Sequence, residues 1–130
     1  MDDKYHDSER RMDNNLQLIM KSRKISNYNK RKISGFVKNL EMRGKTPGTI
    51  LKYLYTLHQM FGRGWIKKDF NKVTKEDLKE VVYCVEKKGR SLQKWDKEKP
   101  WCTETKKSFR ICLKVFFKWL KGNDEPNQYP

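Results

Sequence analysis

Apolar residues recur at spacings of three and four along almost the whole chain, and no stretch alternates between apolar and polar positions as a β-strand would. This period predicts a protein built from helices. The first helix is predicted over about Ser8 to Arg23, and its apolar face carries Met12, Leu16, Ile19 and Met20. The pattern leaves open how firmly this face docks on the rest of the chain.

A second helix is predicted to begin after Ser26, whose side chain can cap the free amide groups of a first turn. It is predicted to end at Gly44, because glycine readily adopts the left-handed conformation that closes many helices. Its apolar face carries Ile33, Phe36, Val37 and Leu40.

The third helix is predicted to follow a short breaker, with Thr46 as its N-cap and Pro47 at its first helical position, where the missing N–H costs nothing. Gly62 and Gly64 are predicted to end it. Its apolar stripe is Ile50, Leu54, Leu57 and Phe61. The connector over residues 63–72 has three apolar side chains that we expect to pin it to the core: Trp65, Ile66 and Phe70.

The fourth helix is predicted to begin after Thr74 and to end at Gly89. Glu76 and Asp77 stand in its first turn, where the helix dipole favours anions. Its buried face is predicted to carry Leu78, Val81, Val82 and Val85.

A polar, charge-rich loop with two tryptophans, Trp95 and Trp101, leads to the last helix. Exposed aromatic residues often anchor interfaces, but Trp101 adjoins the start of that helix and is expected to cover the core. The last helix is predicted to run from Thr103 to Gly122. Its apolar stripe is Phe109, Leu113, Phe116 and Leu120.

Together these patterns predict an all-α fold, a compact bundle of four to five helices. Residues 1–24 are predicted as a partly helical N-terminal extension, residues 25–122 as the main helical domain, and residues 123–130 as a linker or disordered tail. A chain of 130 residues has room for one modest core. Its aromatic content of 12% is too high for a disordered chain.

Charge adds a prediction about the partner. The chain carries 31 Lys and Arg against 16 Asp and Glu, which leaves a net charge of +15. Such an imbalance is costly in self-repulsion unless a polyanion relieves it, and nucleic acid is the commonest polyanion. A lysine-rich surface that only serves solubility is the alternative.

Membrane insertion and catalysis find little support in the sequence. No apolar run approaches the about 20 residues needed to span a bilayer, and no signal peptide opens the chain, so we expect a soluble, cytoplasmic protein with no membrane partner. The three cysteines lack Cys-x-x-Cys spacing, which argues against disulfides and zinc. Only His6 and His58 are histidines, and no phosphate loop or nucleophile motif occurs, so we expect no catalytic residue, metal or cofactor.

Two predicted helices have polar faces suited to nucleic acid. On the last helix, cations recur as one ridge opposite the apolar stripe: Lys107, Arg110, Lys114, Lys118 and Lys121. On the third helix, lysines are mixed with side chains that can hydrogen-bond phosphates or bases: Lys45, Thr49, Lys52, Tyr55, Thr56 and Gln59. A solvated surface is the competing interpretation of both faces.

Three sequence patterns resemble the SAM-like, core-binding N-terminal domain of tyrosine recombinases, the phage integrase family. They are F-V-x-N-L-x-x-R-G-x-T-x-x-T-I-x-x-Y-x-x-x-L over 36–57, V-T-K-E-D-L over 73–78 and W-C-T-E-T-K-K-S-F-R-I-C-L-K-V-F-F-K-W-L over 101–120. The last pattern is particularly similar to archaeal integrases. The resemblance covers about residues 25–122.

The resemblance implies a domain that grips double-stranded DNA as half of a clamp, with the third and last helices facing the DNA, for integration and recombination. The family's catalytic arginines, His-x-x-Arg motif and nucleophilic tyrosine belong to a C-terminal domain, and Tyr129 matches no nucleophile motif. We therefore expect no enzyme activity from this chain alone. Expected partners are the catalytic domain of the same parent chain and other recombinase subunits. A helical protein-interaction module and a repressor-like DNA-binding regulator remain as alternatives.

Overall fold

The computed structural model describes residues 2–89 and 99–124, and the side chains of residues 7–89 and 99–122. Within these ranges the chain forms α1 (Asp2–Lys21), α2 (Asn27–Met42), α3 (Pro47–Gly62), the 3₁₀ turn η1 (Phe70–Lys72), α4 (Lys75–Lys88) and α5 (Thr103–Asp124). No β-strand occurs among the described residues, so the predicted all-α fold is confirmed. Trp95 and Tyr129 lie outside the described residues, as does the tail over 125–130.

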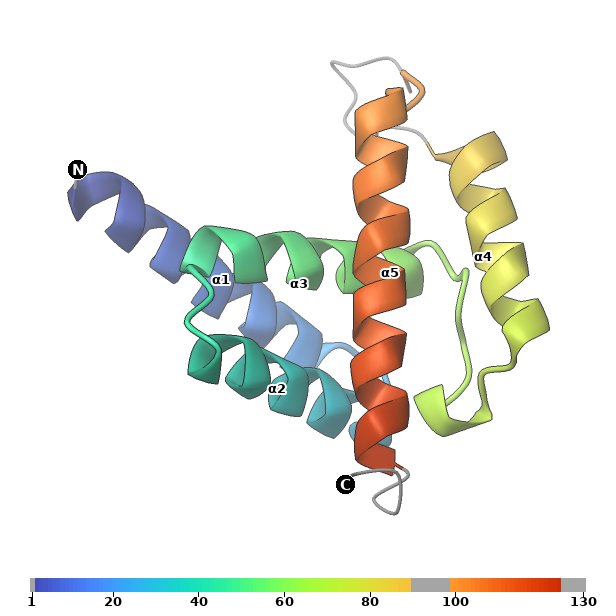
Figure 1. The fold of residues 1–130 in the computed structure, drawn as a ribbon, viewed down its shortest axis with the longest axis horizontal. Coiled ribbons are helices and arrows are strands. Elements are labelled where there is room, and N and C mark those ends of the chain that lie inside the picture. The colour runs from blue at the N-terminus through green and yellow to red at the C-terminus, as the bar shows by residue number, and fades with distance from the viewer. Residues whose placement is uncertain (1, 90–98, 125–130) are drawn as a thin grey trace.

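The helices are arranged around α5. In Figure 1, α1, α2 and α3 lie together on one side, α4 lies on the other side, and α5 crosses α3 between them. α5 contacts α2, α3 and α4. No helix in the described part of the chain is long and apolar enough to cross a membrane.

The predicted helix starts are confirmed by their hydrogen bonds. The hydroxyl oxygens of Ser26 and Thr46 accept hydrogen bonds from backbone N–H groups in the first turns of α2 and α3, at 3.2 Å and 3.3 Å. Thr74 and Asp77 form a reciprocal capping box at the start of α4, with bonds of 3.1 Å and 2.9 Å. These bonds satisfy amide groups that a helix start leaves without partners.

Two helix ends close through left-handed glycines, as predicted. Gly44 after α2 and Gly64 after α3 have φ angles of +77° and +73°. The prediction that Gly122 ends the last helix is wrong, because α5 continues to Asp124. A glycine inside a helix costs only about 1 kcal/mol relative to alanine, so it does not end a helix unless the backbone also turns left-handed.

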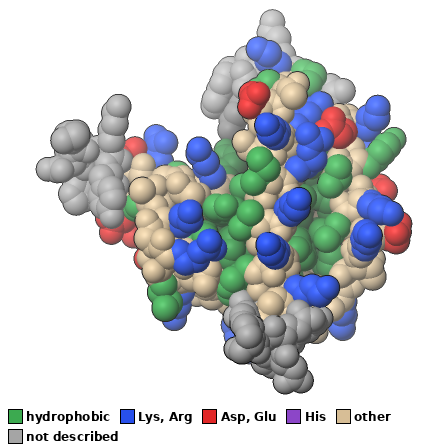
Figure 2. All heavy atoms as spheres, viewed as in Figure 1, with side chains coloured by type: hydrophobic (Ala, Val, Ile, Leu, Met, Phe, Trp, Pro, Cys, Tyr) green, Lys and Arg blue, Asp and Glu red, His purple; other side chains and the backbone are tan. Residues whose placement is uncertain are grey.

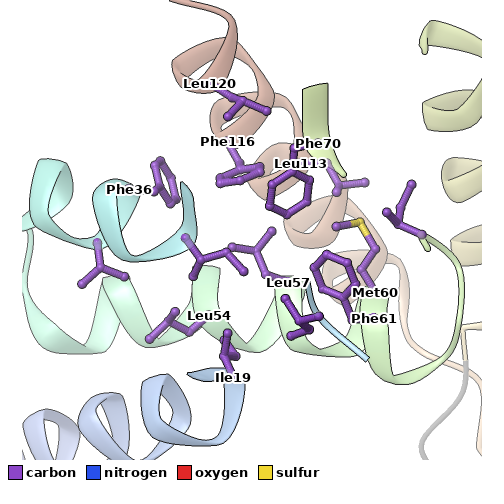
Figure 3. Packing of buried hydrophobic residues seen from close by; sticks show 14 of the residues in the cluster. Ile19, Phe36, Leu54, Leu57, Met60, Phe61, Phe70, Leu113, Phe116 and Leu120 are labelled. Atoms are coloured by element: carbon purple, nitrogen blue, oxygen red, sulfur yellow. The ribbon is translucent and has the colours of Figure 1, made fainter. Parts of the chain in front are cut away.

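The first helix starts earlier and docks more firmly than its sequence indicated. α1 begins at Asp2 rather than near Ser8, because the residues before Ser8 continue the helical backbone without adding to the apolar periodicity by which the helix was predicted. Met12 and Ile19 are buried, and Figure 3 shows Ile19 beside Leu54 of α3. α1 therefore shares one core with the other helices.

Phe36 of α2 lies at the centre of an aromatic cluster. Its ring centre is 5.0 Å from that of Phe116, 5.4 Å from that of Tyr53 and 5.3 Å from that of Trp119. Figure 3 shows Phe36 and Phe116 pointing into the same interior from α2 and α5. All residues of the predicted apolar stripes of the third and last helices are buried, which confirms both stripes.

α4 presents a face slightly different from the predicted one. Val81 and Val85 are buried as expected, but Cys84 joins them, and Leu78 and Val82 are only half-buried. The reason is the position of α4 at the edge of the bundle, where it packs mainly on α5 (Figure 1).

The segments flanking α4 are fixed by packing. In the connector before it, Ile66 and Phe70 are buried and Trp65 is half-buried, so the predicted packing of the connector on the core is confirmed. After it, the backbone N–H of Trp101 donates to the carbonyl of Gly89 at 2.9 Å. The Trp101 ring packs so closely on Gly89 that a Cβ there would collide with it, which confirms the covering role predicted for this tryptophan.

Candidate nucleic-acid interface

The cationic ridge predicted on the last helix is a surface feature of α5. Four of its residues are exposed on one helix face, and we call them the α5 lysine row: Lys107, Lys114, Lys118 and Lys121. Between Lys107 and Lys118 the row extends over about 16 Å, at 1.5 Å per residue. Figure 2 shows Lys and Arg side chains along α5, with hydrophobic side chains exposed between them and the helices to the left.

Arg110 differs from its lysine neighbours. It is half-buried and forms an ion pair with Glu86 of α4. Lys106 also turns to Glu86 and donates to its backbone carbonyl at 3.1 Å. Within the part of the chain that the structure describes, the lysines of the α5 lysine row form no ion pair. The row therefore presents uncompensated positive charge, whereas Arg110 is already neutralised by a carboxylate.

The predicted polar face of the third helix divides into an outer and an inner part. Lys45, Lys52 and Tyr55 are exposed on α3, and Thr49 is half-buried. Thr56 is only 8% exposed, and its hydroxyl donates to the Lys52 carbonyl at 3.1 Å. The outer residues can contact a ligand directly, whereas the hydroxyl group of Thr56 is already engaged within its own helix.

A groove of about 740 Å³ lies between α3 and the first half of α5. It brings together five of the six residues predicted on the third helix: Thr49, Lys52, Tyr55, Thr56 and Gln59. From α5 it is lined by residues that sequence reasoning did not select: Glu104, Thr105, Ser108, Ile111 and Cys112. Lys45 and the predicted α5 residues Lys107, Arg110, Lys114 and Lys118 do not line the groove.

Three charged side chains line the groove, Lys52, Arg63 and Glu104, and the rest of its lining is uncharged. Burial raises the pKa of the Tyr53 hydroxyl and of the Cys112 thiol, so both groups are neutral at pH 7. Phe109 also lines the groove. Two large apolar side chains stay exposed on the walls, Tyr55 at 53% and Ile111 at 49%.

The groove and the α5 lysine row adjoin each other at Ile111. This residue lines the groove, and it stands four residues after Lys107 and three before Lys114. Residues three and four apart are neighbours on a helix surface, so the cationic row forms a border of the apolar groove. The fold thus joins the two faces that the sequence predicted separately.

Arg63 is a residue of the groove that the sequence did not reveal. Its guanidinium lies 4.7 Å from the ring centre of Trp101 and 5.3 Å from that of Trp65. Its Nε donates to the Gln59 side chain at 2.6 Å. Desolvation lowers the pKa of Arg63, but a guanidinium stays charged at neutral pH. Trp65 is close to Arg63 in the sequence, whereas Trp101 is distant in the sequence and contacts Arg63 only because the chain folds.

No protein-family model matches the chain, and comparison with curated proteins and with solved structures gives no significant match. The resemblance to tyrosine recombinases therefore rests on the sequence patterns over 36–57, 73–78 and 101–120 alone. Among the described residues, no three His, Cys, Asp or Glu side chains gather at distances suited to a metal ion. The features available for a functional interpretation are the α5 lysine row and the groove beside it.

Proposed function

We propose that this chain is a DNA-binding domain that grips double-stranded DNA mainly through its phosphates. The observation that carries the proposal is the α5 lysine row, four exposed lysines on one helix face with no ion pair among the described residues. Like charges at this spacing destabilise a helix, and a phosphate backbone relieves their repulsion. The net charge of +15 supports the same class of partner.

The proposed contact surface extends from the α5 lysine row to the outer residues of α3. Lys45 and Lys52 are exposed there and add two cations. Duplex DNA carries one charge per about 1.7 Å of its axis when both strands are counted, so the about 16 Å between Lys107 and Lys118 spans a length of duplex with roughly ten phosphates, and those on the near side can face the row. Contacts of this kind fix position and orientation but read little sequence.

The family resemblance extends the proposal to site-specific recombination. In this role the chain is one half of a DNA clamp in a tyrosine recombinase. Catalysis then comes from the catalytic domain of the same parent chain rather than from the residues described here. Half of a clamp is expected to bind duplex DNA with a Kd of about 10⁻⁴–10⁻⁶ M near physiological salt, the range of nonspecific binding.

A salt titration tests the proposal. The affinity for a fluorescein-labelled duplex is measured by anisotropy from low to physiological NaCl concentration. The slope of log K against log salt should be about −0.9 for each phosphate that the protein neutralises, so three contacts give about −2.7. A slope near zero, or no binding at low salt, contradicts the proposal.

Single lysine substitutions locate the surface. Lys107→Gln, Lys114→Gln and Lys118→Gln should each make the slope less negative by about 0.9. Lys87→Gln is a matched control, because Lys87 is an exposed helical lysine of α4 outside the proposed surface. Equal changes in all four variants would show that only net charge matters and would overturn the assignment of the surface.

An acidic protein partner is the second candidate, and the apolar groove beside the α5 lysine row is the observation that favours it. Exposed aromatic residues such as Tyr55 are common anchors of protein interfaces. NMR shift mapping separates the two candidates. DNA should perturb α3 and α5 together and reach saturation, whereas a module that binds only proteins shows no saturable shifts with DNA.

A further inference from the structure

The inside of the groove is a poor site for a DNA phosphate. Tyr53, Phe109 and Cys112 give part of it an uncharged surface. Of the charged residues in its lining, Arg63 already lies over the rings of Trp65 and Trp101, and Glu104 would repel a phosphate. A phosphate placed against such a surface loses water without gaining comparable hydrogen bonds. The chemistry of the groove therefore suits an uncharged group with apolar faces, although the groove is bordered by cations.

The walls of the groove are suited to a flat ligand group. The exposed ring of Tyr55 offers an aromatic face on α3, and Ile111 offers an aliphatic surface on α5. Nucleobases stack on aromatic side chains whatever their identity, because each base has a π face. The volume of about 740 Å³ falls within the range of about 300–1,000 Å³ that is typical of sites for organic ligands.

We propose that the groove binds one unpaired nucleobase of a DNA molecule whose phosphates lie on the α5 lysine row. Lys52 at the groove and Lys107 and Lys114 beside Ile111 supply the positive charge for the phosphates that flank this base. The Ser108 hydroxyl, exposed at the groove, can hydrogen-bond a base edge. This inference rests on the proposed DNA-binding function and adds to it a preference for unpaired over fully paired DNA.

The preference is measured with two duplexes that share the same strand with the fluorescent base 2-aminopurine and differ only in whether the complementary strand has a thymine opposite it. In one the 2-aminopurine is paired with thymine, and in the other it is a single unpaired bulge. Because stacking on a protein aromatic ring contributes about 1–3 kcal/mol per base, the bulged duplex should bind about 5–150-fold more tightly at the same salt concentration. Binding should also quench the 2-aminopurine fluorescence of the bulged duplex.

A pair of tyrosine variants connects the preference to the groove. Tyr55→Leu keeps an apolar wall but removes the aromatic face, so the ratio of the two affinities should fall towards one and the quenching should be lost. Tyr83→Leu is the matched control, because Tyr83 of α4 is 54% exposed and does not line the groove. It should retain both the ratio and the quenching. Circular dichroism confirms that both variants are folded before binding is compared.

Different binding results would contradict the groove proposal and the proposed DNA-binding function. If the paired duplex binds with the expected salt slope but the bulge gives no higher affinity and no quenching, the groove proposal is overturned while DNA binding stands. A loss of preference in Tyr83→Leu as large as in Tyr55→Leu also overturns it. If neither DNA binds, both proposals fail, and binding of an acidic peptide rich in Glu and Phe at the groove would then assign it to a protein partner.

Discussion

Asn29 is a polar residue that is only 2% exposed, and it joins two segments of the chain. Its Nδ2 donates to the Lys68 carbonyl at 3.0 Å, and its Oδ1 accepts from the Phe70 N–H at 2.8 Å. These bonds fix the connector that carries Phe70 into the core. The apolar pattern of α2 gave no sign of this role, because the partners of Asn29 lie far away in the sequence.

Replacing Asn29 by alanine leaves a buried N–H and a carbonyl without their partners. Since each of the two lost partners costs about 1–3 kcal/mol, Asn29→Ala should lower the free energy of unfolding by about 2–6 kcal/mol, measured by urea denaturation. Asn27→Ala is the control, because Asn27 is exposed at the start of the same helix and its loss should change stability by about 0.5 kcal/mol or less. Equal losses in the two variants would contradict the role given to Asn29.

Thr56 and Arg110 are two residues of the candidate site whose contacts the sequence did not predict. By its position in the helix, Thr56 belongs to the polar face of α3. Because α5 crosses α3 there, Thr56 lies instead inside the groove, near Cys112 of α5. Arg110 follows the lysines of α5 by spacing, but α4 brings Glu86 to it. In both cases a helix distant in sequence determined what the side chain contacts, and the periodicity of one helix contains no such information.

At the scale of helices, the sequence predicted the capped starts of α2, α3 and α4 and the left-handed ends of α2 and α3, because caps and left-handed glycines depend on local chemistry. The start of α1 and the end of α5 lack such local signals and were predicted wrongly. Thr46, Thr74 and Gly44 act within a few residues of themselves. The apolar stripes of α3 and α5 were predictable for a related reason, since each is covered by several helices and needs a continuous apolar surface. The buried face of α4 was predicted less well, because its exposure depends on where the bundle ends.

Two glycines at helix ends should respond oppositely to alanine. Gly44 has a φ of +77°, and a Cβ added there would meet no atom within 4 Å, so Gly44→Ala should destabilise the protein by about 1–2 kcal/mol through its backbone conformation alone. Gly62 is the last helical residue of α3 and has equal space for a Cβ, so Gly62→Ala should stabilise by about 0.4–1 kcal/mol. Chemical denaturation measures both, and changes of the same sign would contradict this account of the helix ends.

At the scale of the whole molecule, composition predicted a class of partner but not a site. The net charge of +15 is a property of the chain, whereas the groove beside the α5 lysine row depends on how α3 and α5 cross. Many of the remaining cations lie elsewhere on the surface, including Lys68 and Lys79, which pair with carboxylates. Paired lysines contribute little to ligand binding, so the distribution of charge matters more than its sum.

Salt should therefore change the stability of the free protein and of its DNA complex in opposite directions. Without DNA, added NaCl screens the self-repulsion of the +15 chain over a Debye length of about 10 Å at 0.1 M, and Tm should rise. With duplex DNA at 100 times Kd, binding adds about 2.7 kcal/mol at low salt, and this gain should disappear as salt weakens the phosphate contacts. Thermal melts at low and high salt, with and without duplex, measure how Tm depends on salt in each sample.

Poly-glutamate serves as the control polyanion: if it stabilised the protein as strongly as duplex DNA, the stabilisation would reflect net charge alone. A Tm that rises with salt equally in both samples would mean that the basic surface does not hold DNA.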